Sequence, residues 1–221
     1  MFNKTKKHLY SKTGFSLVEL LLALATSTII LGAIYSVFNI TNKNVTTQNV
    51  AASVQQSLRS AIGLMSRDIR QAGLDPIGTD SFGIEYAAQS KIRFTLDSID
   101  SGTGDFNGMV DETNSEQVTY EFIKDEYAIT GPIIQTLYET GSSPNSAVLI
   151  RNITNLNFGY FNAANNDLID YGLSPPRVPD DQLADIRSVE ILITIEENAG
   201  RDEPVSRTLT RKVECRNLGF D

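Results

Sequence analysis

Residues 15–38, FSLVELLLALATSTIILGAIYSVF, decide the fold of this chain. These 24 residues contain a single charged side chain, that of Glu19. As an α-helix they would rise about 36 Å, which is enough to cross a hydrocarbon core of about 30 Å. The sequence therefore predicts a membrane-spanning helix, with the rest of the chain on one side of the membrane.

The residues around the start of this span differ from an ordinary secretory signal. A basic leader, residues 1–14, contains four lysines and no acidic residue. Glu19 puts a carboxylate into the apolar run, where comparable charges cost about 2.5–3.5 kcal/mol at a helix centre, so it needs a partner. The small residue suited to cleavage, Gly14, precedes the run, whereas a secretory signal is cut after its apolar segment.

The stretch Lys12-Thr13-Gly14-Phe15-Ser16-Leu17-Val18-Glu19 resembles the processing site of type IV prepilins and type II secretion pseudopilins. The resemblance implies that a prepilin peptidase cuts after Gly14 and methylates the new N-terminal residue, Phe15. It also implies that the retained span enters the core of a helical filament, where Glu19 complements the N-terminal amine of a neighbouring subunit. Opposite charges about 4 Å apart attract strongly at low dielectric, which would help to set the register of assembly.

Two simpler readings use the same residues. A plain signal anchor needs only the basic leader and the span. A conventional signal peptide could be cut at Ala23-Leu24-Ala25, but its apolar core would then contain Glu19 and an apolar remnant would follow the cut. No cysteine lies near the span, which excludes a lipoprotein anchor.

Charge predicts the compartment and argues against some partners. The formal net charge is -8, and removal of the leader leaves 15 basic and 27 acidic residues, or -12. This excess of acidic residues argues against a nucleic-acid partner, which would require a basic face. The leader lysines, against a lone Lys43 shortly beyond the span, predict a cytoplasmic N-terminus and an exported body. The family resemblance implies a single-pass inner-membrane protein with a periplasmic body. It also implies later transfer to a pilus on the cell surface.

Histidine and cysteine usage restricts the chemistry of the body. The sole histidine, His8, lies in the leader, so the processed chain would lack the commonest general base and metal ligand. Cys215, the sole cysteine, cannot form an internal disulfide, and we expect a half-buried strand residue there, with an intermolecular bridge as the alternative. We therefore predict that the chain is not an enzyme and that it needs no cofactor.

An amphipathic helix is predicted to continue from the span over residues 39–73. Its apolar positions recur at steps of four and three, which is typical of a helix with one buried face; they are Val50, Val54, Leu58, Ile62, Met65, Ile69 and Ala72. Gly73 and Pro76 predict its end. A single helix of about 58 residues could run from Phe15, with the Asn- and Thr-rich residues 39–49 as the place where it could loosen.

Strand-like alternation characterises residues 74–221. The pattern predicts strands at residues 92–96, 118–122, 133–138, 147–150, 156–160, 189–195 and 205–215, the last as an edge strand guarded by arginines. A helix followed by strands predicts an α+β fold of the type IV pilin kind, in which an antiparallel sheet packs on the amphipathic half of the helix. Residues 74–221 would form the ectodomain.

A second set of segments resembles one subgroup of the family. Residues 64–76, LMSRDIRQAGLDP, are similar to the corresponding segment of PilW-type minor pilins, a subgroup related to the J-type pseudopilins of type II secretion. Further matching segments are residues 91–97, 156–161 and 216–219. The resemblance implies a minor subunit that primes or caps a type IV pilus in low copy. Its implied partners are the prepilin peptidase, other major and minor pilins, and the inner-membrane assembly platform.

Two loops carry further hypotheses. Residues 97–116 contain six carboxylates, and Asp105-Phe106-Asn107-Gly108 with Asp111 and Glu112 resembles the start of a calcium loop, but without the full ligand spacing. A solvated acidic hairpin loop is the alternative to calcium. Residues 162–185 are rich in proline and acidic residues, and form either a subunit contact or a flexible excursion.

Three classes of function remain open at this stage. The first is a minor type IV pilin involved in pilus assembly, twitching motility or cell adhesion. The second is a J-type pseudopilin of a type II secretion system. The third is a membrane-anchored binding domain that never polymerises, for which the leader would stay uncut.

Overall fold

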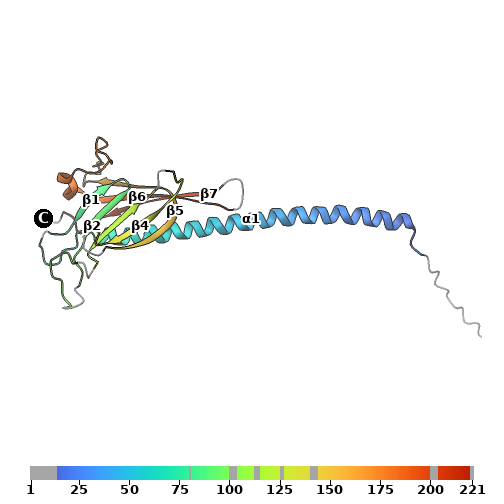
Figure 1. The fold of residues 1–221 in the computed structure, drawn as a ribbon, viewed down its shortest axis with the longest axis horizontal. Coiled ribbons are helices and arrows are strands. Elements are labelled where there is room, and N and C mark those ends of the chain that lie inside the picture. The colour runs from blue at the N-terminus through green and yellow to red at the C-terminus, as the bar shows by residue number, and fades with distance from the viewer. Residues whose placement is uncertain are drawn as a thin grey trace, which may run out of the picture. The chain divides into compact units, whose positions relative to one another are not determined.

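One long helix precedes a seven-stranded sheet in this chain, as a computed structural model shows (Figure 1). The structure describes residues 14–219 except residues 80, 100–103, 112–114, 125–126, 140–143 and 200–203. The elements are α1 (Leu17–Gln71), β1 (Ile84–Ala88), β2 (Lys91–Thr95), β3 (Gln117–Phe122), β4 (Gly131–Leu137), β5 (Asn145–Phe161), the 3₁₀ helix η1 (Asp180–Asp185), β6 (Ser188–Glu197) and β7 (Val205–Glu214). The predicted α+β class is confirmed.

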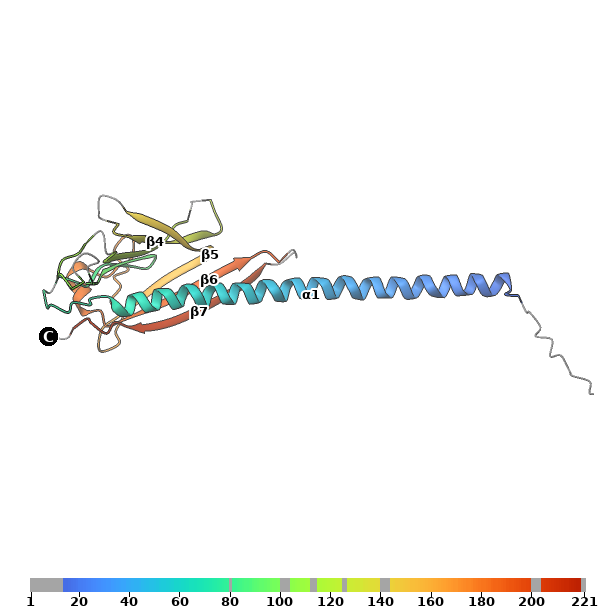
Figure 2. The ribbon, with the colours of Figure 1, turned by 90° about the horizontal axis from the view of Figure 1, so that it is seen from below.

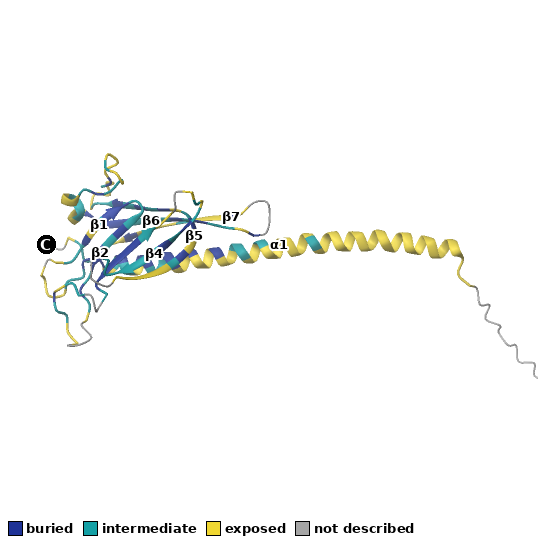
Figure 3. Ribbon diagram, in the orientation of Figure 1, coloured by how far each residue is buried: buried dark blue, intermediate teal, exposed yellow. Residues whose placement is uncertain are grey.

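The chain forms two compact units with their boundary between Thr46 and Thr47. α1 contributes to both, and it is continuous through the Asn- and Thr-rich residues 39–49, where the sequence suggested a looser helix. In the first unit nearly every residue of α1 is exposed, including its leucines and isoleucines (Figure 3). Within the described residues of this unit, the apolar side chains of α1 are thus exposed on all sides of the helix, a pattern typical of a segment that spans a membrane or packs among other helices.

In the second unit, the remaining part of α1 packs on the sheet through the predicted stripe. Val54, Leu58, Ile62, Met65 and Ile69 are each at most 3% exposed and join one core with the strands. From the sheet, this core takes the alternate residues of each strand that face the helix, notably the isoleucines of β6. The two periodicities, 3.6 along the helix and 2 along the strands, thus meet in a single apolar layer.

The sheet is antiparallel throughout, with its strands in chain order from β1 to β7 (Figure 2). Two predicted strands, at residues 147–150 and 156–160, are one strand, β5, and this prediction was wrong. Residues 145–153 of β5 pair with β4 and residues 153–161 pair with β6. Between these halves Asn152 has φ 59°, a conformation that asparagine tolerates better than most residues. In the sequence, the polar residues around Asn152 interrupt the alternation of apolar and polar positions and therefore indicated a turn between two strands.

β1 was missed by the sequence pattern, because its run of Ile84, Glu85, Tyr86, Ala87 and Ala88 alternates poorly. Its outer edge is covered by the predicted 162–185 loop, which is ordered here rather than a free excursion. The amide of Val178 donates to the carbonyl of Ala87 at 2.8 Å, and that of Gln89 donates to the carbonyl of Pro176 at 3.2 Å. The loop therefore protects one end of the sheet.

Candidate functional site

The start of α1 is built from the residues that the sequence singled out. Ser16 is the residue before the first helical position, and Glu19 lies in the first turn. The amide of Ser16 donates to Oε2 of Glu19 at 3.0 Å, and the amide of Val18 donates to Oγ of Ser16 at 3.4 Å. These two bonds form a capping box, which satisfies amides that an apolar environment would leave without partners.

The capping box gives Glu19 a partner within its own chain, which the sequence analysis did not anticipate. Its signal, Ser-x-x-Glu directly before an apolar run, is present in the sequence. Only one carboxylate oxygen is used: no described residue donates a hydrogen bond to Oε1. The helix N-terminus also favours a negative charge in this turn. Glu19 is thus held in place with one oxygen available to a further donor.

Gly14 and Phe15 lie directly before the capping box. Both are non-helical and exposed, and the Phe15 side chain is 88% exposed. No heavy atom lies within 4 Å of a Cβ built on Gly14. The peptide bond between these two residues is therefore not blocked by the described chain. The leader lysines and His8 lie outside the described residues, as does Glu112 of the acidic loop.

Three hydroxyls in the apolar half of α1 are satisfied by the helix backbone. The hydroxyls of Thr26, Ser27 and Thr28 each donate to a backbone carbonyl three or four residues earlier, at 2.7–3.0 Å. Such bonds remove the cost of placing a hydroxyl in hydrocarbon. Within the described residues α1 is the one helix long and apolar enough to cross a membrane, by length and composition.

A polar lock joins the second half of α1 to the sheet. The hydroxyl of Tyr120, on β3, donates to Oδ2 of Asp68 at 2.6 Å, and the side-chain amide of Gln135, on β4, donates to the Tyr120 oxygen at 3.0 Å. Tyr120 is fully buried. Burial, with the hydrogen bond to Asp68 next, raises the pKa of Tyr120 far above its usual range, so the hydroxyl stays a donor.

Charged residues form a network on the opposite face of β1–β3. Lys91 forms ion pairs with Glu121 and Glu139, and Arg93 with Glu85 and Glu139. Burial alone raises the pKa of Glu139, but its hydrogen bonds to Lys91 and Thr119 outweigh that effect and lower it. Burial alone lowers the pKa of Lys91, but its hydrogen bonds and charge interactions with Glu139 and Glu121 outweigh that effect and raise the pKa. The network is a cross-strand brace of the sheet.

The acidic loop uses its carboxylates to hold its own backbone. Both oxygens of Glu116 accept backbone amides, from Ser98 at 3.0 Å and Asp111 at 2.7 Å, and Oδ2 of Asp97 accepts the amide of Gly108 at 3.2 Å. Oδ1 of Asp97 is buried and has no hydrogen-bond partner among the described residues. Among the residues described, no three acidic, histidine or cysteine side chains gather as a metal site. Calcium binding stays a hypothesis.

Cys215 lies just after β7 and is buried rather than half-buried within a strand. Burial raises the pKa of its thiol to about 12, which the Arg187 guanidinium only partly offsets. A buried, protonated thiol is poorly suited to the intermolecular bridge considered as the alternative.

Comparison with protein-family models found no match, and comparison with curated proteins found none. The function of the chain is therefore inferred from its N-terminal residues and from the structure of α1 and the sheet.

Proposed function

We propose that this chain is a minor type IV pilin, a structural subunit that primes or caps a pilus and enters it in low copy through its N-terminal helix. One observation carries the proposal. Gly14 and Phe15 stand immediately before a capped helix whose apolar residues, in the described part of the first unit, are exposed.

The capped start of α1 suits the chain both while it resides in the membrane and after it enters a filament. In a membrane, the apolar residues of α1 face lipid, and the capping box lowers the cost of the exposed helix terminus. In a filament, the same residues would pack against the helices of other subunits. Cleavage after Gly14 would leave Ser16 and Glu19 in place, so the capping box would survive processing, and Oε1 of Glu19 would be available to the amine of a neighbouring Phe15.

The proposed partners follow from these stages. A prepilin peptidase would release residues 1–14 and methylate Phe15, and the inner-membrane assembly platform would transfer the helix to other pilins. The body would lie in the periplasm before assembly and on the cell surface afterwards. No step in this sequence uses a catalytic group of the chain itself, and we propose no enzymatic activity and no cofactor.

Deletion and complementation of the gene test the proposal. We expect the deletion strain to lose surface pili and twitching motility, and the complementing chain to appear in the sheared filament fraction in low amount. Loss of a secreted enzyme with normal pili would instead indicate a J-type pseudopilin. Normal pili and secretion, with the leader uncut, would indicate an anchored binding domain and contradict the proposal.

A further inference from the structure

β7 is a regular strand with one unpaired side. All ten of its residues pair with β6, from Val205 with Glu197 to Glu214 with Ser188, and the register has no bulge. No described strand or bridge pairs with its other side. In an antiparallel strand, alternate residues direct their N–H and C=O groups away from the neighbour. β7 therefore presents a row of backbone donors and acceptors that no described strand pairs; within β7 itself, the Arg207 guanidinium donates to the Ser206 carbonyl at 3.0 Å.

The other strand edges of the sheet differ from that of β7 in length or in what covers them. The outer edge of β1 is covered by residues 176–178. The first half of β5, residues 145–153, also has a single neighbour and six exposed residues, and it lines a hollow together with Ser57 and Ser60 of α1. Seven of the ten residues of β7 are exposed. Of these two edges within the described chain, β7 is the longer, and it carries two arginines on one face.

The two faces of β7 carry different charges. Arg207 and Arg211 pair with Ile195 and Ile191 of β6, so they lie on the face of the sheet that bears the core and α1. Leu209 lies between them and packs against the core. On the other face, the ammonium of Lys212 lies 4.0 Å from the Phe161 ring centroid and also binds Asn165. Lys212 is engaged, whereas the two arginines have no acidic partner in the described chain.

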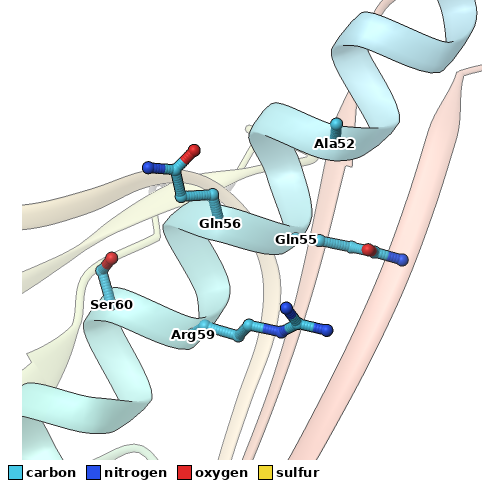
Figure 4. A pocket seen from close by; sticks show the side chains of 5 residues that line it. All are labelled: Ala52, Gln55, Gln56, Arg59 and Ser60. Atoms are coloured by element: carbon cyan, nitrogen blue, oxygen red, sulfur yellow. The ribbon is translucent and has the colours of Figure 1, made fainter.

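α1 adds to this charge. Figure 4 shows that Gln55 and Arg59 extend from the helix toward the side of the red strands, β6 and β7, whereas Gln56 and Ser60 point away from it. Both Gln55 and Arg59 are exposed, and Arg59 forms no ion pair with a described residue. We call Arg59, Arg207, Arg211 and the outer edge of β7 the basic edge. None of these three arginines has an acidic partner among the described residues, although the net charge of the chain is acidic.

The positive charges and the backbone groups of the basic edge indicate what kind of molecule binds there. A second copy could pair its own β7 antiparallel, but pairing centred on Leu209 would place Arg207 opposite the other copy's Arg211, and directly opposed like charges destabilise a sheet. Anionic lipid would neutralise the charges of the arginines but would leave the backbone N–H and C=O groups of β7 without hydrogen-bond partners. A strand with carboxylates at alternate positions satisfies both, because alternate residues of an added strand share the face of Arg207 and Arg211.

We propose that the basic edge binds an extended, carboxylate-bearing strand of another protein, which adds to the sheet beside β7. Backbone hydrogen bonds to the added strand provide affinity. The arginines provide specificity, because they repel another strand that carries positive charges at the same positions. The proposal concerns the body of the chain and does not require that the chain enters a filament, because the contact can form in the membrane-resident protein.

Site-specific photo-cross-linking in cells that express the full chain tests this proposal. A photoreactive residue replaces Thr210 on β7, and its cross-linked peptide is sequenced by mass spectrometry. We expect a peptide from a different protein with acidic residues two or four positions apart. Arg211→Glu should lower the cross-link yield at least about tenfold, and replacing one of the partner's carboxylates with arginine should restore it.

Lys124→Glu is the matched control, because it makes the same charge change at an exposed position outside β7. It should leave the yield unchanged, and equal thermal unfolding midpoints would show that the Arg211→Glu body is folded. A cross-link to a second β7, to lipid, or to no protein would overturn the proposal. So would a yield that Arg211→Glu and Lys124→Glu change equally.

Discussion

Glu19 has two roles at the residue scale, and they can be separated. Its carboxylate caps the amide of Ser16 at 3.0 Å, and in the proposed filament its charge also answers a neighbouring amine. Glutamine can replace glutamate in a capping box but carries no charge. The sequence identified Glu19 from its misplaced charge alone, whereas the capping role emerged only from the hydrogen bonds.

Glu19→Gln and Glu19→Ala should therefore behave alike in assembly but differently in the helix start. We expect both variants to be cleaved after Gly14 and both to be depleted from the sheared filament fraction at least about tenfold, because both lose the charge pair. Quantitative immunoblotting of membrane and filament fractions measures this. If Glu19→Gln assembled normally while Glu19→Ala did not, capping rather than charge would explain the requirement.

Tyr120 and Asp68 form the strongest residue-level test of how α1 is held on the sheet. Tyr120→Phe removes the 2.6 Å bond and leaves a mostly buried carboxylate with fewer donors. We expect a loss of about 1–3 kcal/mol in the free energy of unfolding, measured by denaturation of the full chain in detergent. Arg67→Ala, which removes an exposed ion pair to the same Asp68, should cost less than about 1 kcal/mol. Equal losses would contradict the lock.

Cys215 should be inert in the folded chain. Its thiol is buried and its pKa is raised to about 12, so almost no thiolate forms at pH 8. We expect iodoacetamide to label the denatured chain and to leave the native chain largely unlabelled, as measured by mass spectrometry. Rapid native labelling would show that the C-terminal end of β7 opens.

At the scale of elements, the sequence predicted long periodic runs well and bends poorly. The stripe of α1 and the strong alternation of β6 were confirmed, because each periodicity is matched by one apolar core. The bend at Asn152 was not predicted, because β5 changes its pairing partner there from β4 to β6. β1 was not predicted, because its residues alternate poorly although its partner β2 follows directly in the chain. The edge position of β7 was predicted from its arginines and is confirmed.

Gly131 tests the bulged start of β4. A Cβ at this position would lie 2.1 Å from the carbonyl oxygen of Ile123, and the next residue, Pro132, cannot donate to a neighbouring strand. Gly131→Ala should lower the free energy of unfolding by about 3 kcal/mol. Gly63→Ala, inside α1 with nothing within 4 Å of the added carbon, should raise it by about 0.5–1 kcal/mol. Thermal unfolding midpoints that moved in the same direction would contradict this account.

The charged network on β1–β3 predicts the pH dependence of the sheet. The lowered pKa of Glu139 means that its contribution is present above its ordinary value of 4.5 and is lost as the pH falls below it. The raised pKa of Lys91 means that its contribution is present below 10.5 and is lost above it. Glu139→Gln should cost about 1 kcal/mol at pH 7, and this difference should disappear in strong acid. A difference that persisted in strong acid would contradict the linkage.

At the scale of the whole molecule, the two units differ in the exposure of their apolar side chains. In the first unit the apolar side chains of α1 are exposed, and under the proposal lipid or other subunits would cover them, whereas in the second unit apolar side chains are buried in a core of their own. The fold class could be predicted from the sequence because the apolar span, the amphipathic stripe and the strand alternation follow one another without overlap. The basic edge could not, because it joins α1 to a strand nearly 150 residues away.

The N-terminus of the mature chain tests the central claim most directly. Intact-mass and N-terminal peptide measurements on the chain isolated from its native membrane should give residues 15–221 with one added methyl group on Phe15. An N-terminus at Met1, or a cut at any bond other than that between Gly14 and Phe15, would contradict the proposed processing and, with it, the assembly role of α1.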